Sequence, residues 1–224
     1  MNVTTHHDLE LAHLKERLLL MAGHAERAVD TAISSLIERT ADKALRVIED
    51  DSILDQLEKE IDELSIRLLL KAPLATELRF VTVAIKISRD LERIGDEATT
   101  IARRTLELNV EPQLKPYVDI PRMARIALEM LKEALDAFVN HDTQRACQVI
   151  PRHKEVDAIH RQLQRELASF MIENPKTISR SLNLMTISKA LERIADHATN
   201  IAEDVIFMVS ARDVRHHAAD TPGA

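Results

Sequence analysis

Apolar residues recur along this chain at alternating intervals of three and four positions, the spacing that places side chains on one face of an α-helix. The first such stripe consists of Leu11, Leu14, Leu18, Met21, Ala25, Ala28 and Ala32. Two further stripes follow it, and together they predict helices at about 8–39, 42–71 and 75–108. The connections between these helices, at residues 40–42 and around Pro73, are short. Short connections predict antiparallel neighbours.

A proline-containing segment then interrupts the pattern, because Pro112 and Pro116 cannot continue a helix. After it the same spacing resumes, with apolar stripes over residues 120–138, 149–170 and 184–208. The sequence therefore predicts six helices, three on each side of the proline-containing segment.

The two halves resemble each other in sequence as well as in layout. Residues 91–96 read Leu-Glu-Arg-Ile-Gly-Asp, and residues 191–196 read Leu-Glu-Arg-Ile-Ala-Asp, 100 positions later. Apolar residues of the second helix recur 102 positions later, where Ala146, Val149 and Ile150 match Ala44, Val47 and Ile48. The matches include charged residues that core packing does not require, so they indicate an internal duplication.

We therefore predict an all-α fold made of two tandem, pseudo-symmetric three-helix bundles. The first repeat occupies residues 8–108, the second occupies 117–211, and residues 212–224 form a polar tail. The composition agrees with this fold, because 3 glycines and 2% aromatic residues are few for the turns and strands of a β-rich protein.

Charge and cysteine content narrow the setting in which the protein acts. The formal net charge is −7, and no run of Lys and Arg occurs, which argues against nucleic acid as a partner. Cys147 is the single cysteine, so a reducing compartment is expected. Residues 1–10 lack the apolar core of a signal peptide, and the longest apolar run, 18–23, is too short to cross a bilayer. We expect a cytoplasmic protein with no direct membrane insertion.

Two rows of acidic residues call for an explanation beyond the core. Glu92 and Asp96 lie four positions apart, just off the apolar stripe of the third helix, so their side chains are neighbours. The second helix carries a row consisting of Asp51, Asp55, Glu58 and Asp62. If these two helices pack side by side, the rows converge, and clustered carboxylates suit Mg²⁺, Mn²⁺ or iron.

The second half repeats part of this pattern. Glu192 and Asp196 are present, while the fifth helix offers His153, Asp157 and His160 in place of a row of acids. Imidazole ligands shift the expected metal toward Fe, Zn or Ni.

An ordinary solvated surface is the alternative explanation for the acidic rows. In that case Arg89 or Arg93 pairs with Glu92, as oppositely charged neighbours on a helix commonly do.

Two three-helix repeats, each ending in a helix that carries Leu-Glu-Arg-Ile-x-Asp, resemble the PhoU family of bacterial phosphate-uptake regulators. Further marks of the resemblance are the segments Ala72–Arg79 and Asn200–Glu203. The resemblance extends from about Leu9 to Val209.

The resemblance implies a cytoplasmic homodimer that negatively regulates phosphate uptake and the phosphate-starvation response. Such a regulator links the ATPase of a phosphate ABC transporter to a phosphate sensor histidine kinase. Members of the family bind metal clusters through pairs of acidic motifs. On this chain the implied metal ligands are Asp51, Asp55, Glu92 and Asp96 in the first half and Asp157, Glu192 and Asp196 in the second.

This sequence departs from the family pattern at two positions. His153 stands where an acid is expected, and Thr100 stands where the second half has Asn200. Both departures leave the composition of the second metal site, and the number of metal ions, open.

Two other functions are compatible with the sequence. The first is a metal-dependent phosphohydrolase that uses the surface carboxylates, and the second is a helical spacer whose acids are only surface. An enzyme needs a concave site with a positioned base, whereas the acidic rows lie on convex helix faces, so a binding protein without catalytic residues is favoured. Cys147 has no identifiable base beside it and is interpreted as a packing residue.

Overall fold

The structure, a computed structural model, describes residues 6–71 and 75–211, and within these ranges it contains helices and no strand. The first repeat consists of α1 (His6–Glu38), α2 (Ala41–Leu69) and α3 (Ala75–Leu108). The predicted all-α fold is confirmed. Residues 72–74, which include Pro73, and the predicted polar tail 212–224 lie outside the described residues.

The second repeat has the same plan with one division. Its elements are α4 (Asp119–Asn140), α5 (Thr143–Val149), η1 (Ile150–Arg152), α6 (His153–Glu173), η2 (Pro175–Thr177) and α7 (Ile178–Ser210). The fifth predicted helix is therefore divided by the 3₁₀ turn η1. Pro151 explains the division, because proline lacks an N–H donor and its ring clashes with the preceding turn.

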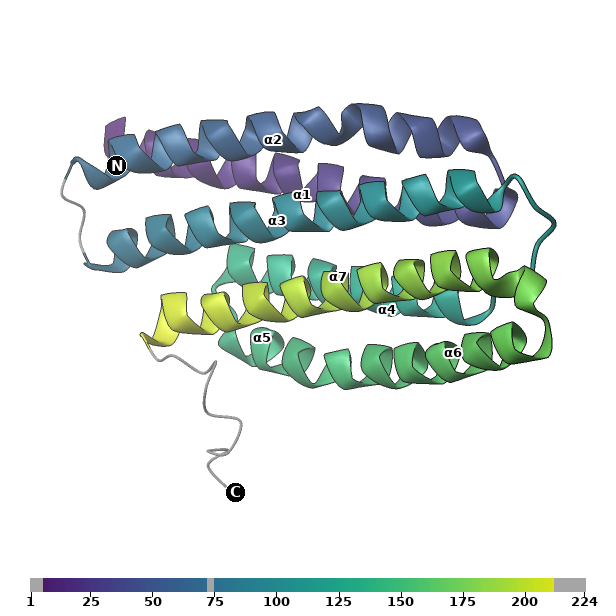
Figure 1. Cartoon of the computed structure of the whole chain (residues 1–224). Helices are drawn as coiled ribbons and strands as arrows, with labels where there is room; N and C mark the ends of the chain where they lie inside the picture. Colours follow the sequence, from purple (N-terminus) through teal and green to yellow (C-terminus); the bar gives the residue numbers. More distant parts are fainter. Residues whose placement is uncertain (1–5, 72–74, 212–224) are drawn as a thin grey trace, which may run out of the picture.

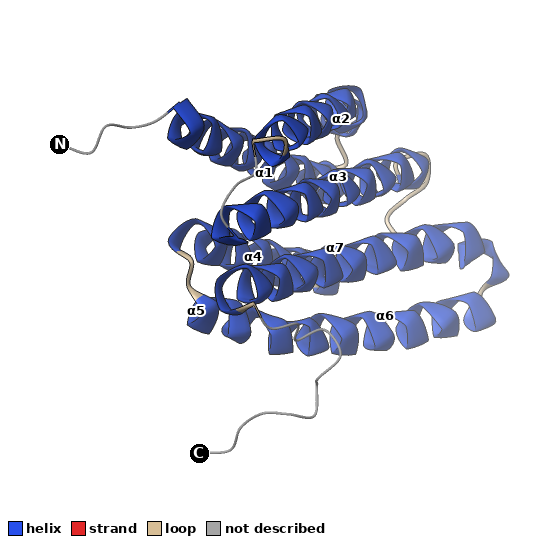
Figure 2. Cartoon of the chain, turned by 90° about the vertical axis from the view of Figure 1, so that its left-hand side faces the viewer, coloured by secondary structure: helices blue, strands red, loops and turns tan. Residues whose placement is uncertain are grey.

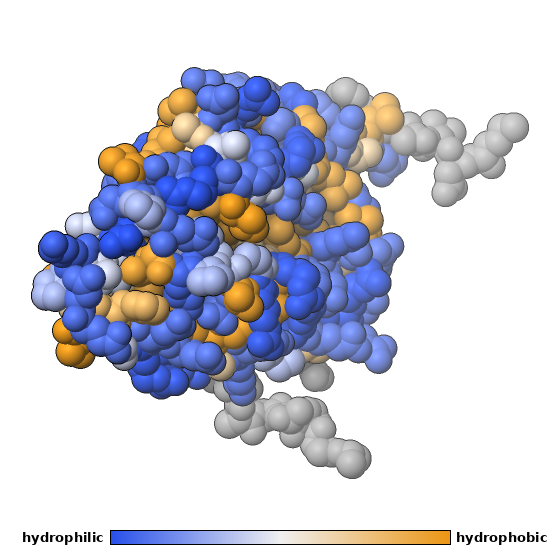
Figure 3. Space-filling view, turned by 90° about the vertical axis from the view of Figure 1, so that its right-hand side faces the viewer, coloured by the Kyte–Doolittle hydropathy of each residue, from blue (hydrophilic) through white to orange (hydrophobic). Residues whose placement is uncertain are grey.

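The two repeats pack side by side. Figure 1 shows α2, α3, α7 and α6 following one another from top to bottom, with α1 and α4 behind them. Figure 2, turned by 90°, again shows α1–α3 stacked above α4–α7, and Figure 3 shows that the opposite end of the molecule carries mostly hydrophilic side chains with small apolar groups among them. The main contact between the repeats joins α3 to α7, which run antiparallel, and α1 meets α4 over a smaller contact.

Equivalent residues of the two repeats occupy equivalent interior positions. Leu91 and Leu191 are both fully buried, and so are Ile94 and Ile194. The buried apolar residues form one continuous cluster that extends through both repeats. Burying a leucine contributes about 2 kcal/mol relative to leaving it exposed, so the duplicated stripe stabilises both repeats in the same way.

Ion pairs join α3 to α7 at the margin of this apolar contact. Within the described residues they are Lys86–Asp204 at 2.9 Å and Glu97–Arg193 at 3.1 Å, and between them His197 Nδ1 lies in hydrogen-bond contact with Asp90 Oδ1 at 2.8 Å. The pairings run in opposite directions along the two helices, as expected for repeats related by a pseudo-twofold axis. Because Asp204 is buried, the Lys86 ammonium helps to offset the loss of solvation of its carboxylate.

The segment between the repeats is held by an arginine from each side. The Arg39 guanidinium donates to the carbonyl oxygens of Leu108, Asn109 and Glu111 at 3.2, 3.2 and 2.5 Å. Arg180 Nη1 donates to the carbonyl oxygen of Pro112 at 2.9 Å. Except for Leu108, these carbonyls lie beyond the end of α3, so the two arginines supply donors to a segment that has no helical N–H partners.

Cys147 is exposed, so the prediction that it is a packing residue is wrong. The residues of α5 that reach the core are Ala146 and Val149, one helical turn apart. Cys147 follows Ala146 directly and therefore lies on a different face of the helix.

Gly95 allows α2 and α3 to approach closely. A Cβ at this position would lie 2.2 Å from Leu54 Cδ1, which is closer than real carbon atoms come. The second repeat has Ala195 at the matching position of α7, and the 102-residue offset places Val156 where the first repeat has Leu54. At these matched positions the first repeat combines glycine with leucine, and the second combines alanine with the smaller valine.

We predict that Gly95→Ala destabilises the protein by about 1–2 kcal/mol, because the overlap with Leu54 outweighs the better helix propensity of alanine. Adding Leu54→Val should relieve the overlap, so that the double variant is more stable than the sum of the single effects predicts by at least about 0.5 kcal/mol. Urea unfolding of the four proteins measures this coupling. Purely additive effects would contradict the proposed contact.

Candidate functional site

The structure brings the acids of α2 and α3 together along the contact between these helices. We call Asp51, Asp55, Glu58, Glu92 and Asp96 the first acidic cluster. The carboxylate of Asp51 comes close to α3, since its Oδ1 lies 3.7 Å from where a Cβ on Gly95 would stand. The prediction that the two acidic rows converge is confirmed in this respect.

Protonation of this cluster is affected by burial and by mutual repulsion. Partial burial raises the pKa of Asp51, and the Asp96 and Asp55 carboxylates raise it further. Partial burial likewise raises the pKa of Glu92, with Asp96 as the nearest repelling neighbour, and that of Glu58. The carboxylates are therefore crowded enough to disfavour their own charges.

Arg93 neutralises part of the first acidic cluster. Its guanidinium lies 3.4 Å from Glu92 Oε2 and 3.1 Å from Asp96 Oδ2. The Arg93 side chain is about half exposed, so these pairs are weak, worth at most about 1 kcal/mol each. Between the two arginines considered from the sequence, Arg93 is the one that contacts Glu92.

The acids and histidines of α6 and α7 form a second cluster on the other side of the repeat contact. We call His153, Asp157, His160, Glu192 and Asp196 the second acidic cluster. Partial desolvation raises the pKa of Asp196, and the Glu192 and Asp157 carboxylates raise it further. Two of the acids predicted for the second site, Glu192 and Asp157, therefore both repel the third, Asp196.

His160 has a defined orientation in the second acidic cluster. Ser188 Oγ donates to the carbonyl oxygen of Met185 at 2.9 Å, so its lone pair is left to accept from His160 Nδ1, 3.0 Å away. Burial lowers the pKa of His160 and favours the neutral ring. Neutral His160 with a proton on Nδ1 has its Nε2 lone pair free to act as a ligand.

Both clusters contain atoms that can bind a metal ion, but the side chains are not arranged to bind one. Carboxylate oxygens suit Mg²⁺, Mn²⁺ or iron, and an added imidazole suits Fe, Zn or Ni. Among the residues that the structure describes, however, no group of three or more His, Cys, Asp or Glu side chains could hold a metal ion as placed. Metal binding at the seven predicted ligands stays a prediction, and it requires side-chain rearrangement.

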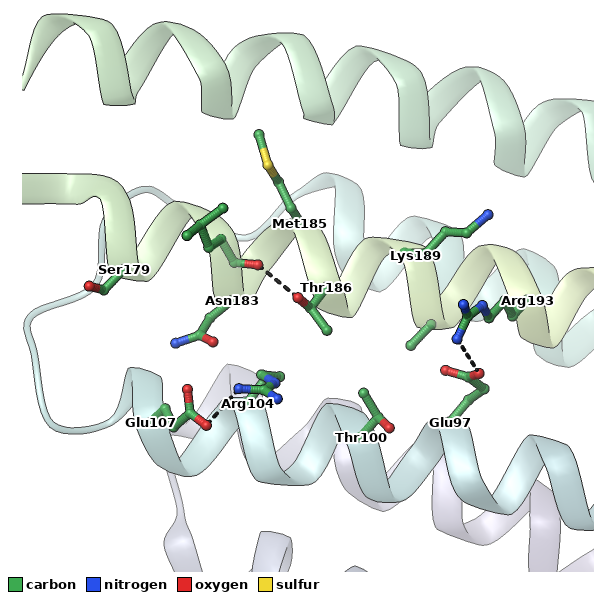
Figure 4. Close-up of a pocket in the computed structure, with 12 residues that line it drawn as sticks. Glu97, Thr100, Arg104, Glu107, Ser179, Asn183, Met185, Thr186, Lys189 and Arg193 are labelled. Carbon is green, nitrogen blue, oxygen red and sulfur yellow. Dashed lines mark hydrogen bonds and ion pairs between the residues drawn. The ribbon is translucent and has the colours of Figure 1, made fainter. Parts of the chain in front are cut away.

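A groove separates the two clusters, on the exposed side of the contact between α3 and α7. The larger part of this groove, the α3–α7 groove, has a volume of about 710 Å³. Figure 4 shows Thr100 and Arg104 of α3 facing Asn183, Thr186 and Arg193 of α7 across it. The sequence did not predict this site, since repeat matching does not tell which helices of the two repeats face each other.

Ser188 and His160 of the second acidic cluster are hydrogen-bonded, but they do not form a catalytic nucleophile and base. Ser188 is fully buried and its hydroxyl donates to a backbone carbonyl, so it is not available to attack a substrate.

In the part of the chain that the structure describes, each helix falls short of the apolar length that crossing a membrane requires.

Comparison with known proteins assigns the chain to a family. The family model described as "PhoU domain" matches residues 18–105 and again residues 120–205, one match in each repeat. The chain is 40% identical over 219 residues to the phosphate-specific transport system accessory protein PhoU homolog of Pseudomonas aeruginosa, covering 95% of this chain and 90% of that protein. The homolog of the same name from Caulobacter vibrioides is 39% identical over 207 residues, with coverages of 92% and 90%.

Solved structures agree with the sequence matches. The crystal structure of PhoU from Pseudomonas aeruginosa superposes with a TM-score of 0.89 at 39% identity, covering 92% of this chain and 99% of that one. The phosphate transport system regulatory protein PhoU from Streptococcus pneumoniae superposes with a TM-score of 0.87 at 28% identity, with coverages of 93% and 99%.

We predict that replacing Glu92 and Asp96 together by alanine lowers the metal content of protein purified without chelator, while the helical circular dichroism is unchanged. Both side chains lie outside the apolar core, so the fold does not depend on them. Elemental analysis of this variant and of the matching Glu192/Asp196 variant measures the effect. Equal metal content in all three proteins would reduce the acidic clusters to ordinary surface.

The crowded carboxylates also predict a pH dependence. Because the raised pKa of Glu58 means that the folded state binds its proton more tightly than the unfolded chain does, the free energy of unfolding should rise as the pH falls through that pKa. The gain ends near the ordinary glutamate pKa of about 4.3. Glu58→Gln should therefore be more stable than the parent at pH 7, and the difference should shrink toward about pH 5. Urea unfolding at both pH values measures the difference in free energy of unfolding between Glu58→Gln and the parent. Glu63→Gln is the control, because it removes the same charge from an exposed position of α2. A difference that is the same at both pH values would contradict the crowding of the carboxylates.

Proposed function

The chain belongs to the PhoU family, and we propose on that basis that it is an accessory protein of phosphate-specific transport. In this role it negatively regulates phosphate uptake and the phosphate-starvation response. It works by binding other proteins and not by catalysis, in the cytoplasm and as a homodimer. Its partners are the ATPase of a phosphate ABC transporter and a phosphate sensor histidine kinase.

The observation that carries this proposal is the placement of the two acidic clusters. Each lies where two helices meet, one on α2 and α3 and the other on α6 and α7, with the α3–α7 groove between them. Desolvated carboxylates with raised pKa values are costly to leave next to one another. A basic partner surface relieves this cost and is attracted over a distance by the same charges.

Regulation by binding also explains what the α3–α7 groove contains. Its titratable lining consists of Arg, Lys and Glu side chains, with Glu97 and Glu107 each already paired with an arginine. Such a lining supplies no poised general base beside a nucleophile, which supports the binding role over the phosphohydrolase. A metal ion bound at either acidic cluster would neutralise carboxylates and change what these surfaces attract.

We predict that Asp96→Lys or Asp196→Lys leaves the fold intact and derepresses phosphate-starvation genes in phosphate-rich medium. The reversal removes a carboxylate from a cluster and adds repulsion toward a basic partner. A reporter fused to a phosphate-responsive promoter measures the effect, and deletion of the gene sets the expected maximum. Glu63→Lys is the matched control, because Glu63 is exposed on α2 outside both clusters.

Two results would contradict the proposal. The first is phosphate-responsive expression that is unchanged by gene deletion. The second is hydrolysis of a phosphate ester such as p-nitrophenyl phosphate by the purified protein at enzymatic rates, which would favour the phosphohydrolase instead.

A further inference from the structure

The α3–α7 groove brings three cationic side chains to one surface from two helices. Arg104 comes from α3, and Lys189 and Arg193 come from α7, so the set exists only where the two repeats meet. In Figure 4 Arg104 and Arg193 lie along the groove between the helices, whereas Lys189 points away from α3 and pairs with Glu192. Arg and Lys are the residues that recognise phosphate groups, through charge-assisted hydrogen bonds.

Each of these cations is itself substantially exposed but has an acidic partner, which for Arg193 is the largely buried Glu97 of α3 at 3.1 Å. Arg104 Nη1 lies 2.7 Å from Glu107 Oε1, and both side chains are substantially exposed. Lys189 pairs with Glu192 three residues further along α7. An exposed pair such as Arg104–Glu107 contributes at most about 1 kcal/mol, whereas a hydrogen bond to a charged group contributes about 1.5–3 kcal/mol.

Neutral donors in the same groove are uncommitted. Among the described residues, the hydroxyls of Thr100 and Ser179 and the amide of Asn183 have no hydrogen-bond partner in the protein. Hydroxyl and amide donors beside Arg and Lys are the combination that phosphate oxygens accept from.

The pseudo-twofold axis supplies an internal comparison. It relates the α3–α7 groove to a second groove of about 490 Å³ at the other end of the same helices, where Arg89 and Arg93 match Lys189 and Arg193. There the polar groups are used by the protein itself, because Asp90 accepts from both His197 and Asn200. The matching arginines are both paired, Arg93 with the first acidic cluster and Arg193 with Glu97, so the grooves differ in their neutral groups: Thr100 is uncommitted where Asn200 is bonded to Asp90.

We propose that the α3–α7 groove binds a phosphate group, either as free inorganic phosphate or as part of a small phosphorylated molecule. Arg104 and Arg193 hold the phosphate oxygens from either side of Thr100, whose hydroxyl completes the hydrogen bonds. Since both helices contribute, the bound phosphate bridges the two repeats. The choice of phosphate among oxyanions rests in part on the proposed function.

The shape of the groove accommodates both sources of phosphate. Its volume of about 710 Å³ falls in the range of about 300–1,000 Å³ that is typical of small-molecule sites, which leaves room beyond a single phosphate ion. Leu182 and Met185 add an apolar wall that suits an organic portion. An organic phosphate is therefore compatible with the site, and free phosphate fills only part of it.

The test is titration calorimetry of the full chain at constant ionic strength with inorganic phosphate, AMP or sulfate as the probe. Arg193→Gln should weaken phosphate or AMP binding by about tenfold or more, the loss expected for one charge-assisted hydrogen bond. Arg93→Gln removes the same charge from the matching position of the other groove and should change the affinity less than about twofold. Thr100→Val, which alters no charge, should also weaken binding, and urea unfolding checks that each variant is folded.

Each outcome decides the proposal. Saturable binding of inorganic phosphate or of AMP that depends on Arg193 and not on Arg93 supports it, and the tighter of the two probes identifies the source. Absence of saturable binding of both probes up to about 10 mM overturns it, as does equal loss in the two arginine variants or equal binding of sulfate. These measurements use purified protein, so they are independent of the gene-expression test that decides the proposed regulatory function.

Discussion

The antiparallel contact between α3 and α7 is the interaction on which the rest of the structure depends. It joins the repeats through apolar side chains that belong to one continuous core, including the buried Leu91 and Leu191. The same contact positions every polar feature discussed above, because the grooves lie on its exposed side and the acidic clusters flank it. Ion pairs such as Lys86–Asp204 then fix the register of the two helices.

Much of the fold follows from the sequence, since apolar spacing and proline positions are local signals. The matching apolar stripes of α3 and α7 predicted that Leu91 and Leu191 occupy equivalent buried positions, and both are fully buried. The division of the fifth helix at Pro151 was within reach of the same reasoning but was not predicted, because the apolar spacing continues across the proline. Cys147 was misplaced for a related reason: a residue next to a stripe lies on a different face from the stripe itself.

The sites were only partly predictable, because they depend on which helices become neighbours. The acids of α2 and α3 were predictable, since short connections force these helices together. The α3–α7 groove was not, since Thr100 and Asn183 belong to different repeats and no sequence signal pairs them. His160 was predicted as part of a set that replaces a row of acids, but its orientation follows from Ser188, a buried residue on another helix.

The charges around the α3–α7 contact are linked, and this linkage has a functional consequence. Lys189 lines the groove and also pairs with Glu192 of the second acidic cluster, so the ammonium cannot serve both equally. An anion that draws Lys189 into the groove leaves Glu192 less compensated and makes the second acidic cluster more negative. If the groove binds an anion as proposed, a metal ion or basic partner surface at the second acidic cluster would then be held more tightly, and by reciprocity it would favour the anion. One lysine thereby couples the contents of the groove to the charge of the surface that a partner meets.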